Sequence, residues 1–214
     1  MSVQKEAFRN YLATKVADSE WIFQQFELYH SLLTKSNTYI NLLSRQTLED
    51  DIWSLHFQDS LLPLETNIDL NNKLILDFGS GGGLPGIPLA LIAPSSEVYM
   101  MDSKKKKMRE VQSFINEMGL TNCYTIPERL EETKLDVLKD SYGLSSKFDL
   151  IVSRSVRIDE ILLNKLFGLL PKGGKILLYK GKDIKEKDLH IPLELVLNVK
   201  KEWGERNLVL IRKI

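Results

Sequence analysis

The sequence is poor in the residues and runs that define several large protein classes. It has one cysteine in 214 residues, so it can form neither an internal disulfide nor a zinc site of several cysteines. No stretch approaches 18 consecutive apolar residues, the length that a membrane-spanning helix needs. The first twenty residues lack the apolar core of a secretory signal. We therefore expect a cytoplasmic protein with no membrane segment and no metal site.

The chain also lacks net charge, because 29 lysines and arginines balance 29 aspartates and glutamates. The total gives no sign of a nucleic-acid partner, and any such inference has to come from local clusters. Hydrophobic residues make up 43% of the sequence and charged residues 27%, which is typical of a globular protein. The length suits one domain with a small appendage. No coiled-coil pattern is present, and we expect a monomer.

The hydrophobic pattern changes near residue 65. Up to that point apolar residues recur at helical spacing, for example at Ile22, Phe26 and Tyr29, and there is no strand signal. Beyond it, short apolar runs alternate with helical patterns. We therefore expect an N-terminal helical extension over residues 1–65 and an α/β domain over residues 66–214.

The second part of the chain predicts a mostly parallel sheet. Alternating strands and helices are typical of open α/β sheets with right-handed crossovers. The last two apolar runs are joined by a turn-like segment and predict an antiparallel hairpin. The expected strands are residues 73–78, 97–101, 123–126, 148–153, 175–179, 193–199 and 207–212, and the expected helices are residues 84–93, 108–118 and 158–170.

A glycine-rich loop follows the first expected strand. Five glycines fall within eight residues, at positions 79, 81, 82, 83 and 86. Such a loop lies at the carboxyl end of the sheet, where open α/β folds bind ligands, and glycine lets the backbone approach a ligand closely. A tight turn without a ligand would need only one glycine. The loop therefore predicts a cofactor site.

Two cofactor patterns overlap in this loop. Read from Gly81, the spacing matches the dinucleotide fingerprint, whereas read from Asp77 it matches the Asp-x-Gly-x-Gly-x-Gly pattern of S-adenosylmethionine sites. A carboxylate at Asp77 would repel a pyrophosphate but can hold an ammonium group, which favours S-adenosylmethionine. Asp102 ends the second expected strand and can accept both ribose hydroxyls of either cofactor. It can also cap the helix that begins near Ser103.

Residues 77–90, DFGSGGGLPGIPLA, resemble the loop of a bacterial family, the small-subunit rRNA (guanine-N7) methyltransferase G, also called glucose-inhibited division protein B. Further matches follow in the family's order over about residues 40–212. One departure is Ser155, where the family usually has alanine. The matching segments are Asn41-Leu42, His56-x-x-Asp59-Ser60-Leu61, Asp102-Ser103, Arg129-x-Glu131, Phe148-Asp149, Ser153-Arg154, Lys180-Gly181 and Glu205-Arg206-x-Leu208-Val209.

The resemblance implies a Rossmann-like class I methyltransferase with a seven-stranded sheet, a C-terminal hairpin and an N-terminal helical extension. It also implies S-adenosyl-L-methionine as the cofactor. By resemblance, the cofactor contacts are Gly79, Leu84, Asp102, Leu130, Glu131 and Arg154. The loop motif and the end of the second strand add Asp77, Gly81, Gly83 and Ser103.

The resemblance further implies a guanine in the decoding-region loop of 16S rRNA, in the small ribosomal subunit, as the substrate. Guanine N7 carries an in-plane lone pair and no proton, so its methylation needs no general base. We expect Arg154 and Lys180, each at the end of a strand, to act by positioning and electrostatics. The expected substrate-binding residues are Asn41, His56, Asp59, Lys104, Lys105, Lys106 and Lys180.

Simpler explanations and other functions stay open from the sequence. The lysines at 104–107 can form a solvated helix face instead of contacting phosphates. His56 and Asp59 can be an ordinary hydrogen-bonded pair. The alternatives are a methyltransferase for a small molecule or protein, a nucleotide-binding oxidoreductase, and a non-catalytic ribosome assembly factor.

Overall fold

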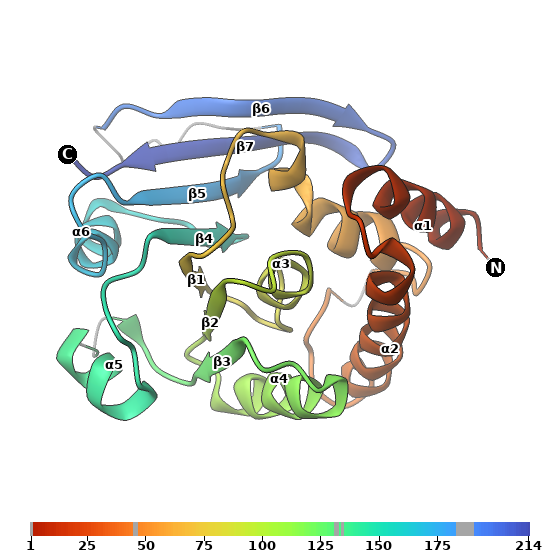
Figure 1. The fold of residues 1–214 in the computed structure, drawn as a ribbon, viewed down its shortest axis with the longest axis horizontal. Coiled ribbons are helices and arrows are strands. Elements are labelled where there is room, and N and C mark those ends of the chain that lie inside the picture. Colours follow the sequence, from red (N-terminus) through yellow and green to blue (C-terminus); the bar gives the residue numbers. More distant parts are fainter. Residues whose placement is uncertain (1, 45–46, 131–132, 134, 183–190) are drawn as a thin grey trace.

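The computed structural model describes residues 2–44, 47–130, 133, 135–182 and 191–214. Its strands form one sheet in the order β3-β2-β1-β4-β5-β7-β6, which Figure 1 shows from β3 at the bottom to β6 at the top. β1 to β5 are parallel, and β7 runs antiparallel to both β5 and β6. This confirms the predicted sheet and its closing hairpin. The strands are β1 Leu74–Phe78, β2 Glu97–Met101, β3 Cys123–Ile126, β4 Leu150–Arg154, β5 Lys175–Lys180, β6 Glu194–Lys201 and β7 Gly204–Arg212.

Helices cover both faces of this sheet. On the right in Figure 1 lie α1, α2, α3 and α4, whereas α5 and α6 lie on the left. Each face buries its own hydrophobic cluster, as expected for parallel strands that read as nearly continuous apolar runs. The helices are α1 Val3–Lys15, α2 Ser19–Asn37, α3 Gly86–Ile92, α4 Lys105–Met118, α5 Leu135–Tyr142 and α6 Glu160–Gly168, with a π-helix η1 at Ile52–Gln58 and a 3-10 helix η2 at Leu62–Glu65.

The N-terminal helices share one hydrophobic cluster with the sheet. Phe8, Phe26 and Phe57 are fully buried, and their rings contact one another at centroid distances of 4.8 to 6.0 Å. The same cluster includes Val98 and Met100 of β2. The helical extension therefore contributes to the core that supports the sheet. The division of the chain at residue 65 stays a prediction.

The structure differs from the sequence prediction at several element boundaries. α6 begins at Glu160 because the side chain of Asp159 accepts a hydrogen bond from the Leu162 N–H and so caps the helix. α3 begins at Gly86, two residues later than expected. α5 was not predicted, since it has only eight residues and a single buried side chain, that of Leu138. Among the described residues, no helix is long and apolar enough to cross a membrane.

Candidate active site

Two cavities lie at the carboxyl ends of the parallel strands. The glycine-loop cavity, of about 240 Å³, lies beside β1 and β2. The arginine cavity, of about 370 Å³, lies beside β4 and β5. The glycine-loop cavity is lined by Phe78, Gly79, Met101, Asp102, Ser103, Glu128, Arg129, Leu130 and Val156. The arginine cavity is lined by Thr47, Leu55, His56, Asp59, Leu62, Arg154, Ser155, Tyr179, Lys180, Gly181, Arg206 and Asn207.

The glycine loop has the backbone geometry that the sequence predicted. Gly79 and Gly81 have φ of 78° and 60°, a region that other residues rarely adopt. A Cβ on Gly79 would lie 2.3 Å from Cγ2 of Val156, so a side chain at this position would require Val156 to move. A Cβ on Gly81 would meet nothing within 4 Å. The backbone is therefore tightly packed at Gly79 and faces open space at Gly81, which is suited to a ligand lying along the loop.

Asp102 holds the loop and the start of α4 together. Its Oδ2 accepts a hydrogen bond of 3.0 Å from the Gly81 N–H, and its Oδ1 accepts one of 2.8 Å from the Lys104 N–H. Each carboxylate oxygen has a second lone pair, so the side chain can still accept ribose hydroxyls. The alternative that Asp102 caps the helix is wrong, because the N-cap of α4 is Lys104 and no side chain caps the helix. The contact of Asp102 with the ribose stays a prediction.

Asp77 lies behind the loop and lines neither cavity. It is fully buried, and its Oδ2 accepts a hydrogen bond of 2.8 Å from the Gly86 N–H at the start of α3. Its Oδ1 has no hydrogen-bond partner among the described residues. Burial raises the pKa of Asp77 to about 6, and the nearby Ser80 side chain and the bond from Gly86 partly oppose that rise. A buried carboxylate with one orphaned oxygen fits a cationic group placed against the loop.

The predicted cofactor residues do not all fall in one place. Four of them, Gly79, Asp102, Ser103 and Leu130, line the glycine-loop cavity. Leu84 is buried beside the loop, and Gly81 is not among the residues that line either cavity. Glu131 lies outside the described residues.

Gly83 is packed between α3 and α2, because a Cβ there would lie 2.8 Å from Cδ1 of Ile87 and 3.1 Å from the Tyr29 hydroxyl. Tyr29 donates a hydrogen bond of 2.8 Å to the Gly82 carbonyl. In the sequence, Tyr29 stands out only as part of a helical apolar stripe. Nothing in that stripe marks it as a partner of the loop, because the contact spans 53 residues of sequence.

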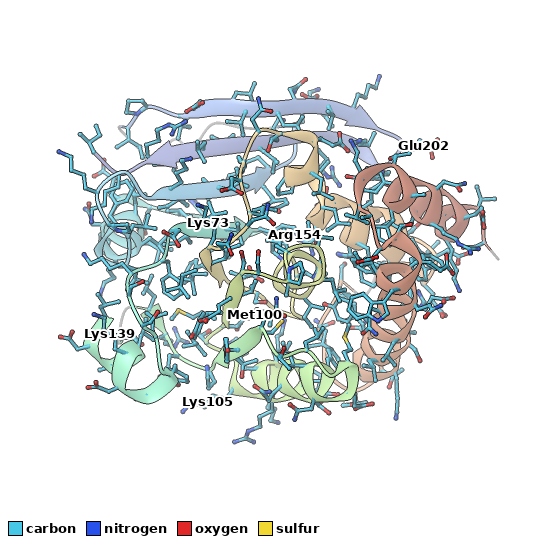
Figure 2. The ribbon with its side chains drawn as sticks, in the orientation of Figure 1. Lys73, Met100, Lys105, Lys139, Arg154 and Glu202 are labelled. Atoms are coloured by element: carbon cyan, nitrogen blue, oxygen red, sulfur yellow. The ribbon has the colours of Figure 1, made fainter. Side chains whose placement is uncertain are left out.

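Arg154 ends β4 and lines the arginine cavity, near the middle of the molecule in Figure 2. Its Nη2 lies 3.2 Å from Nδ1 of His56, and its Nη1 donates to Oδ2 of Asp59 at 3.3 Å. Nη1 also reaches the carbonyl oxygens of Leu55 and His56, both at 3.4 Å. The structure thus directs Arg154 to predicted substrate residues. Its predicted cofactor contact stays a prediction.

The burial of His56 keeps its imidazole neutral. Burial, followed by the charges of Arg154 and Arg206, lowers its pKa to about 3. We infer that Nδ1 accepts a hydrogen bond from Arg154, which leaves the hydrogen on Nε2, at 3.5 Å from the Thr47 hydroxyl. His56 is therefore a hydrogen-bond donor toward the cavity. Among the described residues no hydrogen bond connects the side chains of Asp59 and His56. Instead, Arg154 is hydrogen-bonded to both of them.

Arg206 lines the arginine cavity, although it was not among the predicted site residues. Its Nε donates a hydrogen bond of 2.6 Å to Oδ1 of Asp59, whose side chain is only 7% exposed. The Glu205-Arg206 match in the family resemblance was the available signal. Arg206 lies on the last strand, and the sequence does not show that this strand, β7, pairs with β5 and so reaches the cavity.

The other predicted substrate residues are divided between the cavity and the surface. Lys180 lines the arginine cavity next to Gly181. Asn41, Lys104, Lys105 and Lys106 are exposed and line neither cavity. Figure 2 shows Lys105 at the rim of the molecule beside α4. Their contact with a substrate stays a prediction.

No metal site is present in the part of the chain that the structure describes, where no group of three His, Cys, Asp or Glu side chains could hold an ion. Cys123 is buried, and burial raises the pKa of its thiol to about 12. A thiol in this state is a poor nucleophile.

Comparison with known proteins identifies the family. The family model for rRNA small subunit methyltransferase G matches residues 22–201. The ribosomal RNA small subunit methyltransferase G of Lactobacillus acidophilus is 32% identical over 206 residues, which cover 89% of this chain and 82% of that protein. The protein of the same name from Carboxydothermus hydrogenoformans is 33% identical over 202 residues, with 89% and 83% covered.

Solved structures with a similar fold are also methyltransferases. Magnesium protoporphyrin IX methyltransferase from Synechocystis PCC 6803, with bound S-adenosylmethionine, has a TM-score of 0.56 and 16% identity, over 87% of this chain and 97% of that one. TrmN from Thermus thermophilus has a TM-score of 0.53 and 16% identity, and the match covers 73% of this chain and 48% of that one. These likenesses show the fold alone. The chain has the fold of class I S-adenosylmethionine-dependent methyltransferases and belongs to the rRNA small subunit methyltransferase G family.

Proposed function

We propose that this protein transfers a methyl group from S-adenosyl-L-methionine to N7 of a guanine in the decoding-region loop of 16S rRNA. The observation that carries the proposal is the pairing of the two cavities. A glycine-loop cavity suited to the cofactor lies at the carboxyl ends of β1 and β2, and a cationic cavity lies beside it at β4 and β5. The reaction takes place in the cytoplasm, with the protein acting as a monomer on the small ribosomal subunit.

The residues in and around the glycine loop fit S-adenosylmethionine. The open space at Gly81 admits a ligand, and Asp102 offers acceptor oxygens to ribose hydroxyls. The orphaned Oδ1 of Asp77 supplies negative charge behind the loop for the ammonium and sulfonium groups. When bound, the cofactor supplies an electrophilic methyl group. A dinucleotide would instead place a pyrophosphate near this carboxylate, which is unfavourable.

The protein's own residues position the guanine, and the reaction at N7 needs no proton transfer. N7 has a free lone pair, so no group has to remove a proton before methylation. The neutral His56 and the guanidinium of Arg154 offer hydrogen-bond donors to O6 of a guanine, which leaves the lone pair of N7 free for the methyl group. Lys180 at the end of β5 adds positive charge at the same cavity. Catalysis then depends on holding N7 in line with the methyl group.

A methyl-transfer assay tests the proposal. The pure protein is incubated with labelled S-adenosylmethionine and small ribosomal subunits from cells that lack this methylation, and the rRNA is digested to nucleosides. We expect the label in 7-methylguanosine. Label in another nucleoside would reject N7 as the acceptor. The absence of label, on subunits and on protein-free rRNA alike, would reject the proposed function.

A further inference from the structure

Arg206 and Asp59 give the arginine cavity a second guanidinium beside Arg154. We propose that Arg206, held by Asp59, binds the phosphate group of the target nucleotide, and that Asp59 is a positioning residue without direct contact to RNA. This inference rests on the proposed rRNA substrate. It adds Arg206 to the substrate-binding residues and changes the role expected for Asp59.

One carboxylate bridges the two arginines. Oδ1 of Asp59 accepts from Nε of Arg206 at 2.6 Å, and Oδ2 accepts from Nη1 of Arg154 at 3.3 Å. The side chain of Asp59 is 7% exposed, that of Arg154 12% and that of Arg206 22%. Their geometry is therefore set by packing. A single carboxylate cannot neutralise two guanidiniums. One positive charge of this trio is left for an anionic ligand.

Arg206 keeps donors available for such a ligand. Its Nε is used by Asp59, and its Nη1 donates to the Glu205 carbonyl at 3.0 Å. Nη2 has no hydrogen-bond partner among the described residues. The planar guanidinium presents its donors in a fork that matches the oxygens of a phosphate. The neighbouring Asn207 donates to the Gly181 carbonyl at 2.6 Å, which fixes the backbone after β5 at the cavity.

The electrostatics of the reaction favour a phosphate over a second contact with the base. Two guanidiniums, of Arg154 and Arg206, line the cavity with the carboxylate of Asp59 between them. Methylation at N7 makes the guanine ring cationic, and uncompensated positive charge beside it would oppose the reaction. A phosphate in the same cavity supplies the missing negative charge. The cavity volume of about 370 Å³ lies within the usual range for small-ligand sites.

The salt dependence of RNA binding tests this inference. The dissociation constant for small ribosomal subunits lacking the methylation is measured at several salt concentrations for the wild-type protein, Arg206→Gln and Arg206→Lys. We expect Arg206→Gln to reduce the slope of log K against log salt by about 0.7 to 0.9, the effect of one phosphate contact. Arg206→Lys should restore the slope without the full affinity, because lysine keeps the charge and lacks the fork.

Arg212→Gln is the matched control. Arg212 lies on the same strand, is exposed and pairs with Glu194, away from the cavity, so its replacement should leave the slope unchanged. The affinity for S-adenosylhomocysteine should be the same in all variants, which shows that they are folded. Equal slopes for wild type and Arg206→Gln, or equal reductions of the slope in Arg206→Gln and Arg212→Gln, would overturn the phosphate contact. Failure of the wild-type protein to bind the subunits would also overturn it.

A second readout separates this inference from the proposed function. Asp59→Asn keeps the shape of the side chain but removes the charge that holds the two guanidiniums. We expect it to raise KM for the subunits more than it lowers kcat, whereas a role in the chemical step would lower kcat at an unchanged KM. Binding with the expected slopes but without 7-methylguanosine would reject the proposed reaction alone. Product formation with an unchanged slope in Arg206→Gln would reject the phosphate contact alone.

Discussion

The hydroxyl of Tyr29, on α2, donates a hydrogen bond of 2.8 Å to the backbone carbonyl of Gly82 in the glycine loop. Tyr29 is fully buried, and its ring stacks on Phe57 at a centroid distance of 5.2 Å. Gly82 is further enclosed, because a Cβ there would lie 3.2 Å from Leu33 and 3.3 Å from Leu42. The N-terminal helices therefore determine the position of the loop that is expected to bind the cofactor.

Tyr29→Phe should weaken cofactor binding. The change removes one buried hydrogen bond, leaves the Gly82 carbonyl without its partner, and should cost about 1 to 3 kcal/mol of stability. Because the loop is then without its anchor, we expect a severalfold rise in the dissociation constant for S-adenosylhomocysteine, measured by calorimetry. Tyr11→Phe is the control, since Tyr11 donates to the Leu61 carbonyl away from the loop. Equal cofactor affinities in the two variants would contradict the anchoring role.

Gly81→Val should abolish cofactor binding while the protein stays folded. A side chain at Gly81 would stand in the open space along the loop, where the cofactor is expected. The backbone at Gly81 has φ of 60°, so the substitution also carries strain. Gly119→Val is a matched control, because Gly119 has φ of 65° with nothing within 4 Å of its Cβ position and lies at the end of α4, outside the glycine loop. Full methyl transfer by Gly81→Val would show that the cofactor binds elsewhere.

Asp102→Ala should eliminate the thermal stabilisation of the protein by S-adenosylhomocysteine. A ligand at about 100 times its dissociation constant adds about 2.7 kcal/mol to the stability of the wild-type protein. The variant lacks the carboxylate oxygens that would accept bonds from the ribose. It also loses the hydrogen bonds from the Gly81 and Lys104 N–H groups. A normal melting shift in the variant would refute the cofactor role of Asp102. A circular dichroism spectrum like that of the wild type would exclude unfolding as the cause.

The stability of the cofactor-free protein should depend on the ionisation of Asp77. Its folded pKa is about 6 against a usual 3.8, so the folded state binds the proton more tightly. Protonated Asp77 therefore stabilises the folded state. This contribution to the free energy of unfolding is complete below pH 3.8 and is lost as the pH rises to about 6. The decrease is about 3 kcal/mol at most. The free energy of unfolding of Asp77→Asn, measured in urea between about pH 4 and pH 8, should lack this decrease with pH. If the variant keeps the pH dependence of the wild type, the decrease comes from other groups.

The four lysines at 104–107 should contribute to RNA binding through charge alone. No carboxylate within salt-bridge distance is found for them among the described residues, and Lys104, Lys105 and Lys106 are exposed. Their replacement by glutamine should lower the salt slope of subunit binding by about 0.7 to 0.9 for each phosphate that is no longer neutralised. The same change at Lys139 and Lys147, both exposed elsewhere, serves as the control. An unchanged slope would make the run a solvated helix face.

Local patterns in the sequence were sufficient for the sheet and for the glycine loop. The strands read as continuous apolar runs because parallel strands are buried on both faces. The loop was recognisable because positive φ at Gly79, Gly81 and Gly83 leaves glycine as the favoured residue. The end of α4 was predicted at Gly119 for the same reason, since that residue adopts the left-handed conformation. α5 was missed because it has a single buried position.

The sequence by itself determined the order of the elements, the cofactor loop and the residues at the strand ends, since each depends on neighbours within a few positions along the chain. The tertiary structure alone decided which of those residues meet. Asp59 bridges Arg154 and Arg206, which lie 95 and 147 residues away in sequence. Tyr29 reaches Gly82 across 53 residues. Such contacts depend on how helices and sheet pack, and local periodicity carries no information about that packing.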